Sequence, residues 1–453
     1  MINENKIESL LKNAPDSSAV RDILKKSKKL ERLSLVDTAT LLNVQNDQLW
    51  SEIFEAAAYV KQTIYGNRLV MFAPLYISNL CKNECLYCGF RASNKDVHRK
   101  VLSQKEIYDD TLALLKTGQK RILLVSGEAY PEDGLQYILD SIKTVYSVQD
   151  GKNNIRRLNV NIAPVTTEEF KILKKADIGT YQLFQETYHK PSYKKLHTKG
   201  PKSDYDYRLQ TIDRAFEAGI DDVGIGILFG LYDYKFEILS LISHIEHLEE
   251  KFGMGPHTIS IPRLEPADGS DIASNPPYPV DDYSFKKIIA VLRLTVPYTG
   301  LILSTRETPQ MRRDAIDLGI SQISAGSKTN PGGYSEGKSV EQFSLGDHRS
   351  LDDVIQDICS KGAIPSFCTS CYRLGRTGLD FMEYAKPGDI KKKCLPNALY
   401  TFQEYIDDYA SDETKQMGEE MIKKTLEDVP SEIKENIIKN LNKIRSGKRD
   451  IYE

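Results

Sequence analysis

The chain has 453 residues, of which 28% are charged and 9% aromatic, and its formal net charge is -3. This length allows one large catalytic domain with appendages, and the balanced charge lacks the basic excess of a nucleic-acid-binding surface. No apolar run approaches the roughly 20 residues of a membrane-spanning helix and the first residues do not resemble a secretory signal, so we expect a cytoplasmic protein without a membrane or nucleic-acid partner.

Residues 1–66 are predicted to form a helical extension. In "SAVRDILKKSKKLERLS" and "QLWSEIFEAAAYVKQTIYG", apolar residues recur three and four positions apart, which is the period of an amphipathic helix. The pattern changes to short apolar segments at residue 67, where we place the first domain boundary.

Eight short apolar segments follow, and amphipathic stretches separate most of them. The predicted strands are 69–78, 121–127, 157–164, 180–185, 223–230, 257–264, 300–307 and 321–326. Strand–helix alternation repeated eight times over about 260 residues is typical of a (β/α)8 TIM barrel. An open doubly wound sheet is the alternative, but the strand count favours an α/β fold with a barrel over residues 67–344.

Residues 345–453 are predicted to form a C-terminal helical domain. Helices are expected in "HRSLDDVIQDICSKG", "ALYTFQEYIDDYA" and "EIKENIIKNLNKIR", whereas "PSFCTSCYRLGRTG" has the small polar residues of a loop. Cys359 falls on the apolar side of the first of these helices and is expected to be a core residue.

Three cysteines, Cys81, Cys85 and Cys88, lie within one short stretch. In a cytoplasmic chain such a group indicates metal ligands rather than disulfides. They follow the first predicted strand, so they belong to the C-terminal mouth of the barrel, where barrel enzymes keep their active sites. A zinc loop is one alternative, but structural zinc usually takes four ligands, and three thiolates suit a 4Fe–4S cluster with one open iron.

A second group of three cysteines, Cys368, Cys371 and Cys394, lies in the tail. It again lacks a fourth thiolate. Two interpretations remain open from the residues: a zinc site completed by a distant histidine, or a second cluster with an open iron.

The spacing of the first group, C-x3-C-x-aromatic-C with Tyr87 as the aromatic residue, resembles the signature of radical S-adenosylmethionine (SAM) enzymes. The resemblance implies a 4Fe–4S cluster whose open iron binds SAM, and cleavage of SAM to a 5'-deoxyadenosyl radical. It places Tyr87 beside the adenine, and Gly127 and Glu128 near the SAM amine, with Ser126 where the family usually has glycine. Arg208 is a candidate partner for the SAM carboxylate, or a surface residue.

Polar residues also follow the fourth and seventh predicted strands. The block "FQETYH" supplies side chains that we expect to line the site near SAM or substrate: Gln185, Glu186 and His189. In "LSTRE", strand alternation would place Ser304 and Arg306 on one face. An arginine beside a hydroxyl forms a reasonable carboxylate clamp, although a salt bridge from Arg306 to a helix acid at the barrel rim is an alternative.

With the second cysteine group, blocks such as "GTYQLFQETYHKPSY", "GPHTISIPRL" and "PSFCTSCYRLGRTG" resemble the HydG family of tyrosine lyases, the maturases of the FeFe-hydrogenase H-cluster, over nearly the whole chain. The related 2-iminoacetate synthase of the thiazole pathway resembles the barrel but lacks the tail cysteines. The resemblance implies cleavage of L-tyrosine at Cα–Cβ to p-cresol and dehydroglycine, and conversion of dehydroglycine to CO and cyanide. It further implies that these products bind an iron at a second 4Fe–4S cluster held by the tail cysteines.

The resemblance also assigns residues and partners. It implies that Ser304, Thr305 and Arg306 contact tyrosine, and that His257 ligates the iron beside the second cluster. His257 opens the sixth predicted strand, so we expect the tail to pack on the N-terminal end of the barrel, opposite the first cluster; a hydrogen-bonded rim histidine is the alternative. The implied partners are a one-electron reductant of the ferredoxin or flavodoxin type and other hydrogenase maturation proteins. A thiazole-pathway lyase and a non-catalytic iron–sulfur or zinc scaffold remain alternatives.

Overall fold

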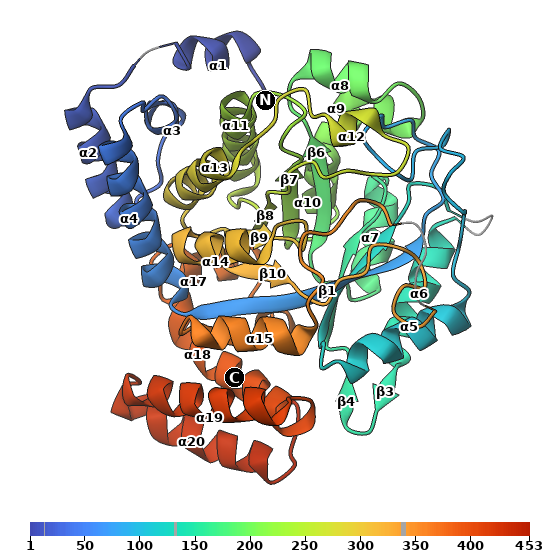
Figure 1. Ribbon diagram of the computed structural model, residues 1–453, viewed down its shortest axis with the longest axis vertical. Helices are drawn as coiled ribbons and strands as arrows, with labels where there is room; N and C mark the ends of the chain where they lie inside the picture. The colour runs from blue at the N-terminus through green and yellow to red at the C-terminus, as the bar shows by residue number, and fades with distance from the viewer. Residues whose placement is uncertain (13, 131–133, 337–340) are drawn as a thin grey trace.

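Eight parallel strands of the computed structural model close into a barrel (Figure 1). The structure describes residues 1–12, 14–130, 134–336 and 341–453. The barrel strands are β1 (Arg68–Ser78), β2 (Arg121–Ser126), β5 (Arg157–Asn161), β6 (Tyr181–Glu186), β7 (Val223–Ile227), β8 (Thr258–Ser260), β9 (Gly300–Leu303) and β10 (Gln322–Ser324). They follow one another around the barrel in chain order, and β10 pairs with β1. The predicted (β/α)8 barrel is therefore confirmed, and the open sheet is wrong.

The strand β1 has 11 residues, all buried, and it pairs with three neighbours. Its first half pairs with β10 and with β11 (Ile364–Ser366), and its second half pairs with β2. The sequence predicted a loop in the block that begins at Pro365, because that block is rich in glycine and small polar residues, but its first two residues belong to β11. An edge strand tolerates proline, and β11 brings the chain directly to Cys368.

Helices surround the barrel, as the amphipathic stretches predicted. They are α5 (Gln104–Lys116), α6 (Leu135–Ser147), α7 (Thr167–Lys175), α8 (Lys190–Leu196), a short 3-10 helix (Pro201–Ser203), α9 (Tyr205–Leu209), α10 (Thr211–Glu217), α11 (Tyr234–Phe252), α12 (Asp271–Ser274), α13 (Asp282–Thr295) and α14 (Pro309–Leu318). A small antiparallel hairpin, β3 (Gln149–Asp150) and β4 (Asn153–Asn154), follows α6. Helix α5 starts at a capping box, in which the side chains of Ser103 and Glu106 each accept a hydrogen bond from the other's backbone N–H.

The N-terminal residues form four helices that pack on one side of the barrel (Figure 1). These are α1 (Glu4–Leu10), α2 (Ser17–Lys28), α3 (Leu35–Leu42) and α4 (Asp47–Tyr65). Helix α4 packs against α13, and α3 packs against α11. The helical prediction for this region is confirmed, although periodicity alone did not separate α3 from its neighbours.

The C-terminal residues are mostly helical. They form α15 (Leu351–Ser360), α16 (Ser370–Arg373), α17 (Gly378–Ala385), α18 (Ile390–Asp408), α19 (Asp412–Glu427) and α20 (Ser431–Arg445). Helix α18 packs against β1, β11 and α4, and it begins earlier than predicted, so that it carries Cys394. Cys359 on α15 is 5% exposed, which confirms its placement in the core. Within the described ranges, no helix has the length and apolar character needed to cross a membrane.

Helix α11 fixes the segment that follows Glu186 at the end of β6. The Glu237 carboxylate accepts hydrogen bonds from the Tyr188 backbone N–H, at 2.7 Å, and from the Thr187 hydroxyl. Two turns further along the helix face, His244 Nδ1 lies 2.9 Å from the Tyr188 hydroxyl. Burial lowers the pKa of His244 to about 4, so the imidazole is neutral in the folded protein at neutral pH.

We expect His244 to make the fold sensitive to acid. Between pH 6.5 and 4 the unfolded chain binds a proton at this position that the folded chain does not, so stability falls as the pH drops through this window. By pH 5 the loss is about 2 kcal/mol. The thermal midpoint of His244→Phe, measured against its own value at pH 7.5, should therefore fall less at pH 5 than that of the wild type. His98→Phe, which replaces an exposed imidazole, is the control, and equal falls in all three proteins would contradict the prediction.

Candidate functional site

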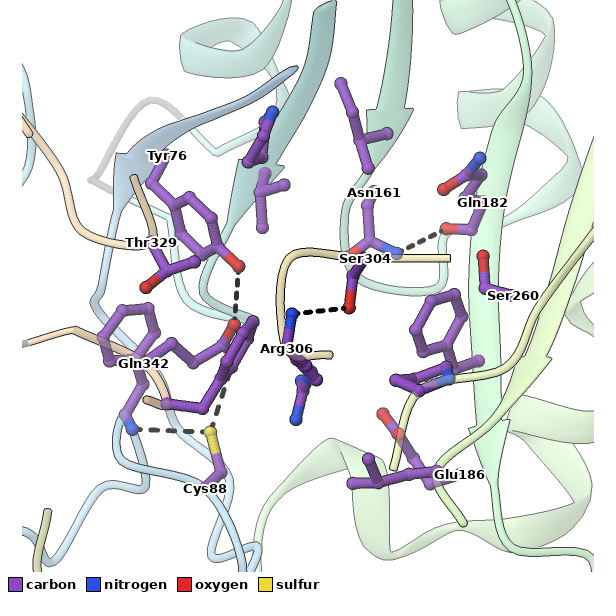
Figure 2. Close-up of a pocket in the computed structure, with 18 of the residues that line it drawn as sticks. Tyr76, Cys88, Asn161, Gln182, Glu186, Ser260, Ser304, Arg306, Thr329 and Gln342 are labelled. Carbon is purple, nitrogen blue, oxygen red and sulfur yellow. Dashed lines mark hydrogen bonds between the residues drawn. The ribbon is translucent and has the colours of Figure 1, made fainter. Parts of the chain in front are cut away.

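The first cysteine group lies over the C-terminal end of the barrel. Cys81, Cys85 and Cys88 follow β1 and line a cavity of about 210 Å³. The cavity continues into the barrel, where its walls come from the ends of several strands (Figure 2). The predicted placement of this group at the catalytic mouth is thus observed.

The segment after α8 holds the cysteine loop. Cys85 and His197 form an antiparallel backbone bridge, and the Tyr87 hydroxyl lies 2.8 Å from His197 Nε2. His197 Nδ1 lies 2.9 Å from the carbonyl oxygen of Tyr193. Since a carbonyl only accepts, Nδ1 carries the proton and Nε2 accepts from Tyr87. Burial raises the pKa of the Cys85 thiol, so only a bound metal would stabilise the thiolate form in this loop.

A ring of buried charges connects this loop to the neighbouring strands. The Asn83 amide donates to Glu128 at 2.7 Å, and the Arg208 guanidinium donates to the other Glu128 oxygen at 2.9 Å. The Lys202 ammonium donates to Glu186 at 2.6 Å, and its backbone N–H donates to Asn83 at 2.8 Å. Arg208 also lies 3.7 Å from Glu186. The predicted cofactor residues Glu128, Arg208 and Glu186 therefore meet in one network, which the sequence alone did not connect.

Arg208 and Glu128 are both enclosed. The Arg208 side chain is 4% exposed, so the surface alternative is wrong. Burial opposes ionisation of Glu128, but Arg208 and Lys202 hold the pKa of its carboxyl below the ordinary value, which keeps an anion available for an amine. A Cβ atom on Gly127 would lie 2.1 Å from the carbonyl oxygen of Leu80. The glycine is therefore required for the close approach of β2 to the cysteine loop.

Glu186 adopts an unusual backbone conformation at the cavity wall. Its φ is +70°, in the left-handed region that non-glycine residues rarely occupy, and the β6–β7 register shifts at this point. The irregularity aims the carboxylate at Lys202. Gln185 and His189 do not line the cavity: His189 caps α8 and stacks on Tyr232 with ring centroids 3.6 Å apart. The prediction that these two residues line the site is wrong. Gln185 falls on the opposite face of β6 from Gln182 and Phe184, which line the cavity, and the strand has ended before His189.

Ser304, Thr305 and Arg306 all line the cavity, and Figure 2 shows Ser304 and Arg306 side by side. Strand β9 ends at Leu303, so these residues form a turn, which brings Thr305 to the same cavity although strand alternation would separate it. The Arg306 guanidinium stacks on the Phe343 ring at 3.3 Å. In the described ranges no acid pairs with it, so the rim salt bridge is absent. Burial lowers the pKa of Arg306, and a carboxylate ligand would relieve that cost.

Several residues of this cavity carried no sequence signal. Asn83 and Lys202 are two of them. Another is Gln342, which accepts from the Tyr76 hydroxyl at 2.7 Å and places its amide nitrogen 3.8 Å from Cys88 Sγ (Figure 2). The contacts of Gln342 and the contact between Asn83 and Lys202 join segments more than 100 residues apart, so no local spacing marks them.

The second cysteine group lies at the opposite end of the barrel. Cys368, Cys371 and Cys394 line a pocket together with His257. Other residues of this pocket stand at the first positions of β1, β2, β9 and β10: Arg68, Arg121, Gly300 and Gln322. The structure thus brings the predicted second set together, at the predicted N-terminal end of the strands.

His257 is oriented by a buried carboxylate. Its Nδ1 lies 2.6 Å from Asp222 Oδ2, and its ring stacks on Phe381 with centroids 4.0 Å apart. Although burial opposes ionisation of Asp222, His257 lowers the pKa of that carboxyl. Asp222 then accepts a hydrogen bond from the Nδ1 proton, which leaves Nε2 as the basic nitrogen, as in many histidine metal sites.

Two thiols of this pocket interact directly. A hydrogen bond from Cys371 lowers the pKa of Cys394 to about 6.

The donor sets fit clusters better than single ions. All seven cysteines are free. Across the described residues, no three His, Cys, Asp or Glu side chains converge closely enough to hold one metal ion. A zinc ion needs its ligands around one centre, whereas each thiolate of a cubane binds a different iron. Each group supplies three thiols and no fourth, which suits a 4Fe–4S cluster with one open iron.

A (β/α)8 barrel with this cysteine loop at its C-terminal mouth defines a radical SAM enzyme, whose cofactors are a 4Fe–4S cluster and SAM. The model of the Radical SAM superfamily matches residues 75–244, and that of the Biotin and Thiamin Synthesis associated domain matches residues 260–364.

Two solved structures are similar to the chain over nearly its whole length. One, of HydG, a maturase of the FeFe-hydrogenase, is 49% identical with a TM-score of 0.97 and covers 100% of this chain and 99% of that one. The other, HydG from Carboxydothermus hydrogenoformans, is 40% identical with a TM-score of 0.83 and covers 97% and 100%. The 2-iminoacetate synthase of Salmonella typhimurium is 34% identical over 335 residues, which are 74% of this chain and 86% of that protein. The chain belongs to the HydG family of radical SAM enzymes.

The role of the first cysteine group as cluster ligands can be tested by comparing its loss with the loss of another cysteine. We expect Cys88→Ala to abolish 5'-deoxyadenosine formation from SAM under reducing anaerobic conditions, since a cluster with two thiolates is poorly held. Cys359→Ala also removes a buried thiol, but on α15, and should keep the activity. Product assay by chromatography decides, and persistent activity in Cys88→Ala would refute the assignment.

Proposed function

We propose that this radical SAM lyase cleaves L-tyrosine at Cα–Cβ to p-cresol and dehydroglycine, and that the dehydroglycine yields CO and cyanide. We further propose that these are bound by an iron at a second 4Fe–4S cluster and supply FeFe-hydrogenase H-cluster assembly. The observation that carries the proposal is the pair of cysteine trios at opposite ends of one barrel. The family membership and the full-length similarity to HydG structures support it.

The proposal divides the chain into three parts. Residues 1–66 form the helical extension, residues 67–344 the catalytic barrel, and residues 345–453 the domain that binds the second cluster. Neither family model reaches Cys368, so the support for the third part comes from the similar HydG structures, which include the whole tail.

At the first site, Cys81, Cys85 and Cys88 would hold the cluster that binds SAM. When bound, the cluster and SAM supply a 5'-deoxyadenosyl radical. Tyr87 would lie beside the adenine. Glu128, Arg208 and Glu186 would receive the amino and carboxylate groups of SAM, and Gly127 would allow the close backbone approach beside them.

Arg306 would hold the tyrosine carboxylate, with Ser304 and Thr305 as hydroxyl partners. Its guanidinium stacks on Phe343 and donates to the carbonyl oxygen of Arg263 at 3.3 Å. These contacts orient it, and no acid among the described residues neutralises its charge. Fixing this end of the amino acid directs its amino group toward the radical. Loss of a hydrogen atom from the amine weakens the Cα–Cβ bond. The departing benzylic fragment then gains one electron and one proton to become p-cresol.

At the second site, Cys368, Cys371 and Cys394 would hold a second 4Fe–4S cluster. The iron that receives CO and cyanide is substrate rather than resident cofactor, and His257 would ligate it through Nε2. The hydrogen bond from His257 to Asp222 fixes the ring for that role.

The partners follow from the chemistry. A one-electron reductant of the ferredoxin or flavodoxin type would feed the first cluster, and other hydrogenase maturation proteins would take the iron product. Seven free thiols suit a reducing compartment such as the cytoplasm.

A 2-iminoacetate synthase that supplies only the fragment from tyrosine is the second candidate, because the relative from Salmonella typhimurium is 34% identical. That match spans 74% of the chain, whereas the HydG structures span nearly all of it. The pocket formed by the tail cysteines and His257 favours the HydG function. A non-catalytic scaffold would leave the Arg306 cavity without a purpose.

Arg306→Ala tests substrate binding. A charged hydrogen-bonded pair contributes about 1.5–3 kcal/mol, so we expect kcat/KM for p-cresol formation to fall roughly 10- to 100-fold. Arg306→Lys should recover only part of it, because the fork geometry is lost. Cluster content should be unchanged in both variants. Normal p-cresol output from Arg306→Ala would exclude the proposed role.

Cys394→Ala tests the division of labour between the two sites. Anaerobic incubation with SAM, dithionite and tyrosine should still give p-cresol, while iron falls from about eight to about four per chain and the iron–carbonyl–cyanide product is lost. Infrared spectroscopy detects the carbonyl and cyanide stretches. If the wild type also gave p-cresol without CO and cyanide, the 2-iminoacetate synthase alternative would replace the proposal.

A further inference from the structure

The second cysteine trio is assembled from two separate segments. Cys368 and Cys371 lie in and beside the short helix α16, directly after β11, whereas Cys394 lies near the start of α18. The first trio, in contrast, comes from one loop. A cluster bound by the second trio therefore requires a contact that holds the two segments at a fixed distance from each other.

Asn397 makes such a contact. It is 1% exposed and lies one helical turn after Cys394. Its Nδ2 donates to the carbonyl oxygen of Lys393 at 2.8 Å and to the main-chain oxygen of Glu453 at 2.7 Å. Its Oδ1 accepts from the Ser370 hydroxyl at 2.8 Å and from the Glu453 N–H at 3.0 Å. An asparagine amide has two donors and two acceptor positions, and all of them are used here.

These partners are the immediate neighbours of the trio. Ser370 lies between the two cysteines of the first segment, and its hydroxyl is 3.3 Å from Cys368 Sγ. Lys393 directly precedes Cys394. Pro396, inside α18, removes one backbone N–H from the helix at this point, so the bond from the Asn397 side chain reinforces a weakened turn.

Residues 450–453 add a second set of contacts to the same segment. The Asp450 carboxylate accepts hydrogen bonds from both terminal guanidinium nitrogens of Arg373, at 2.6 and 2.8 Å. Arg376 donates to the main-chain oxygen of Glu453 at 2.8 Å, and the Arg373 guanidinium stacks on the Tyr452 ring at 3.7 Å. Both arginines follow Cys371 within five residues, so this strap covers the loop that carries it.

We propose that Asn397 is a positioning residue for the second cysteine trio, and that the strap of residues 450–453 holds the other side of the same loop. The inference rests on the proposed function, because it assigns a second cluster to this trio. Asn397 touches neither substrate nor reacting atoms. It acts by fixing Ser370 and the backbone beside Cys394, which sets the separation of the thiols.

The test replaces the amide with an apolar group of similar size. Asn397→Leu, reconstituted anaerobically, should lose about half of roughly eight irons per chain and the electron paramagnetic resonance signal of the second cluster. The first-cluster signal and p-cresol formation should remain. Asn43→Leu is the matched control, since Asn43 is also buried and donates to a backbone carbonyl, that of Leu10 at 2.9 Å, but lies in the N-terminal helices. It should keep both signals.

Two results would overturn the proposal. Full iron content and an unchanged second signal in Asn397→Leu would show that the amide is not needed. Loss of the first signal as well would show a general folding defect instead of a positioning role.

A measurement on the iron-free chain separates this inference from the proposed function. Alkylation of Cys371 and Cys394, followed by mass spectrometry, should be several-fold faster in Asn397→Leu and Asp450→Ala than in the wild type and in Asn43→Leu. If the wild type bound only about four irons, the proposed function would fail, yet faster labelling would still support the positioning role. Unchanged labelling would refute it.

Discussion

The parallel pairing of β1 with both of its barrel neighbours is the constraint on which both sites depend. Alternate residues of a strand face the same side, and the inward face of β1 runs from one site to the other. Arg68 and Val70 line the second pocket, and Phe72, Pro74 and Tyr76 line the first. The first cysteine loop leaves the end of this strand, and β11 docks on its beginning to deliver Cys368. A single strand therefore sets the separation of the two cysteine groups, and its inward face is a wall shared by both cavities.

Buried charge has a common pattern at the two ends. At the first site, the charges of Glu128, Glu186, Lys202 and Arg208 neutralise one another. Arg306 forms no ion pair with an acid of the described residues. At the second site, no acid within the described ranges forms an ion pair with Arg68 or Arg121, which line the same pocket as the three thiols. An unpaired buried cation is costly, so each end suits an anionic occupant. This agrees with a substrate carboxylate at one end and a thiolate-ligated cluster at the other.

The sequence predicted the features that depend on local spacing. Eight apolar segments identified the barrel, and three cysteines on one loop identified the first site. It failed where distant contacts decide the conformation. Pro365 and its small neighbours predicted a loop, but pairing with β1 makes a strand. Gln185 and His189 belong to the same polar block as Glu186, yet Gln185 falls on the other face of β6 and His189 lies beyond the end of the strand. Lys202 joins the site only because the segment after α8 folds back over the cysteine loop.

The contrast between local spacing and distant contacts also separates the two cysteine groups, because only the second depends on the packing of other elements. Cys81, Cys85 and Cys88 are spaced by one loop, and short contacts from Tyr87 and Asn83 are enough to orient it. Cys394 is not held near Cys371 by closeness in the sequence, since helix α17 and two turns lie between them. Its position depends on the packing of α18 under the barrel and on a saturated buried amide. A tail of helices is therefore a structural requirement of the second site, and a barrel alone could carry only the first.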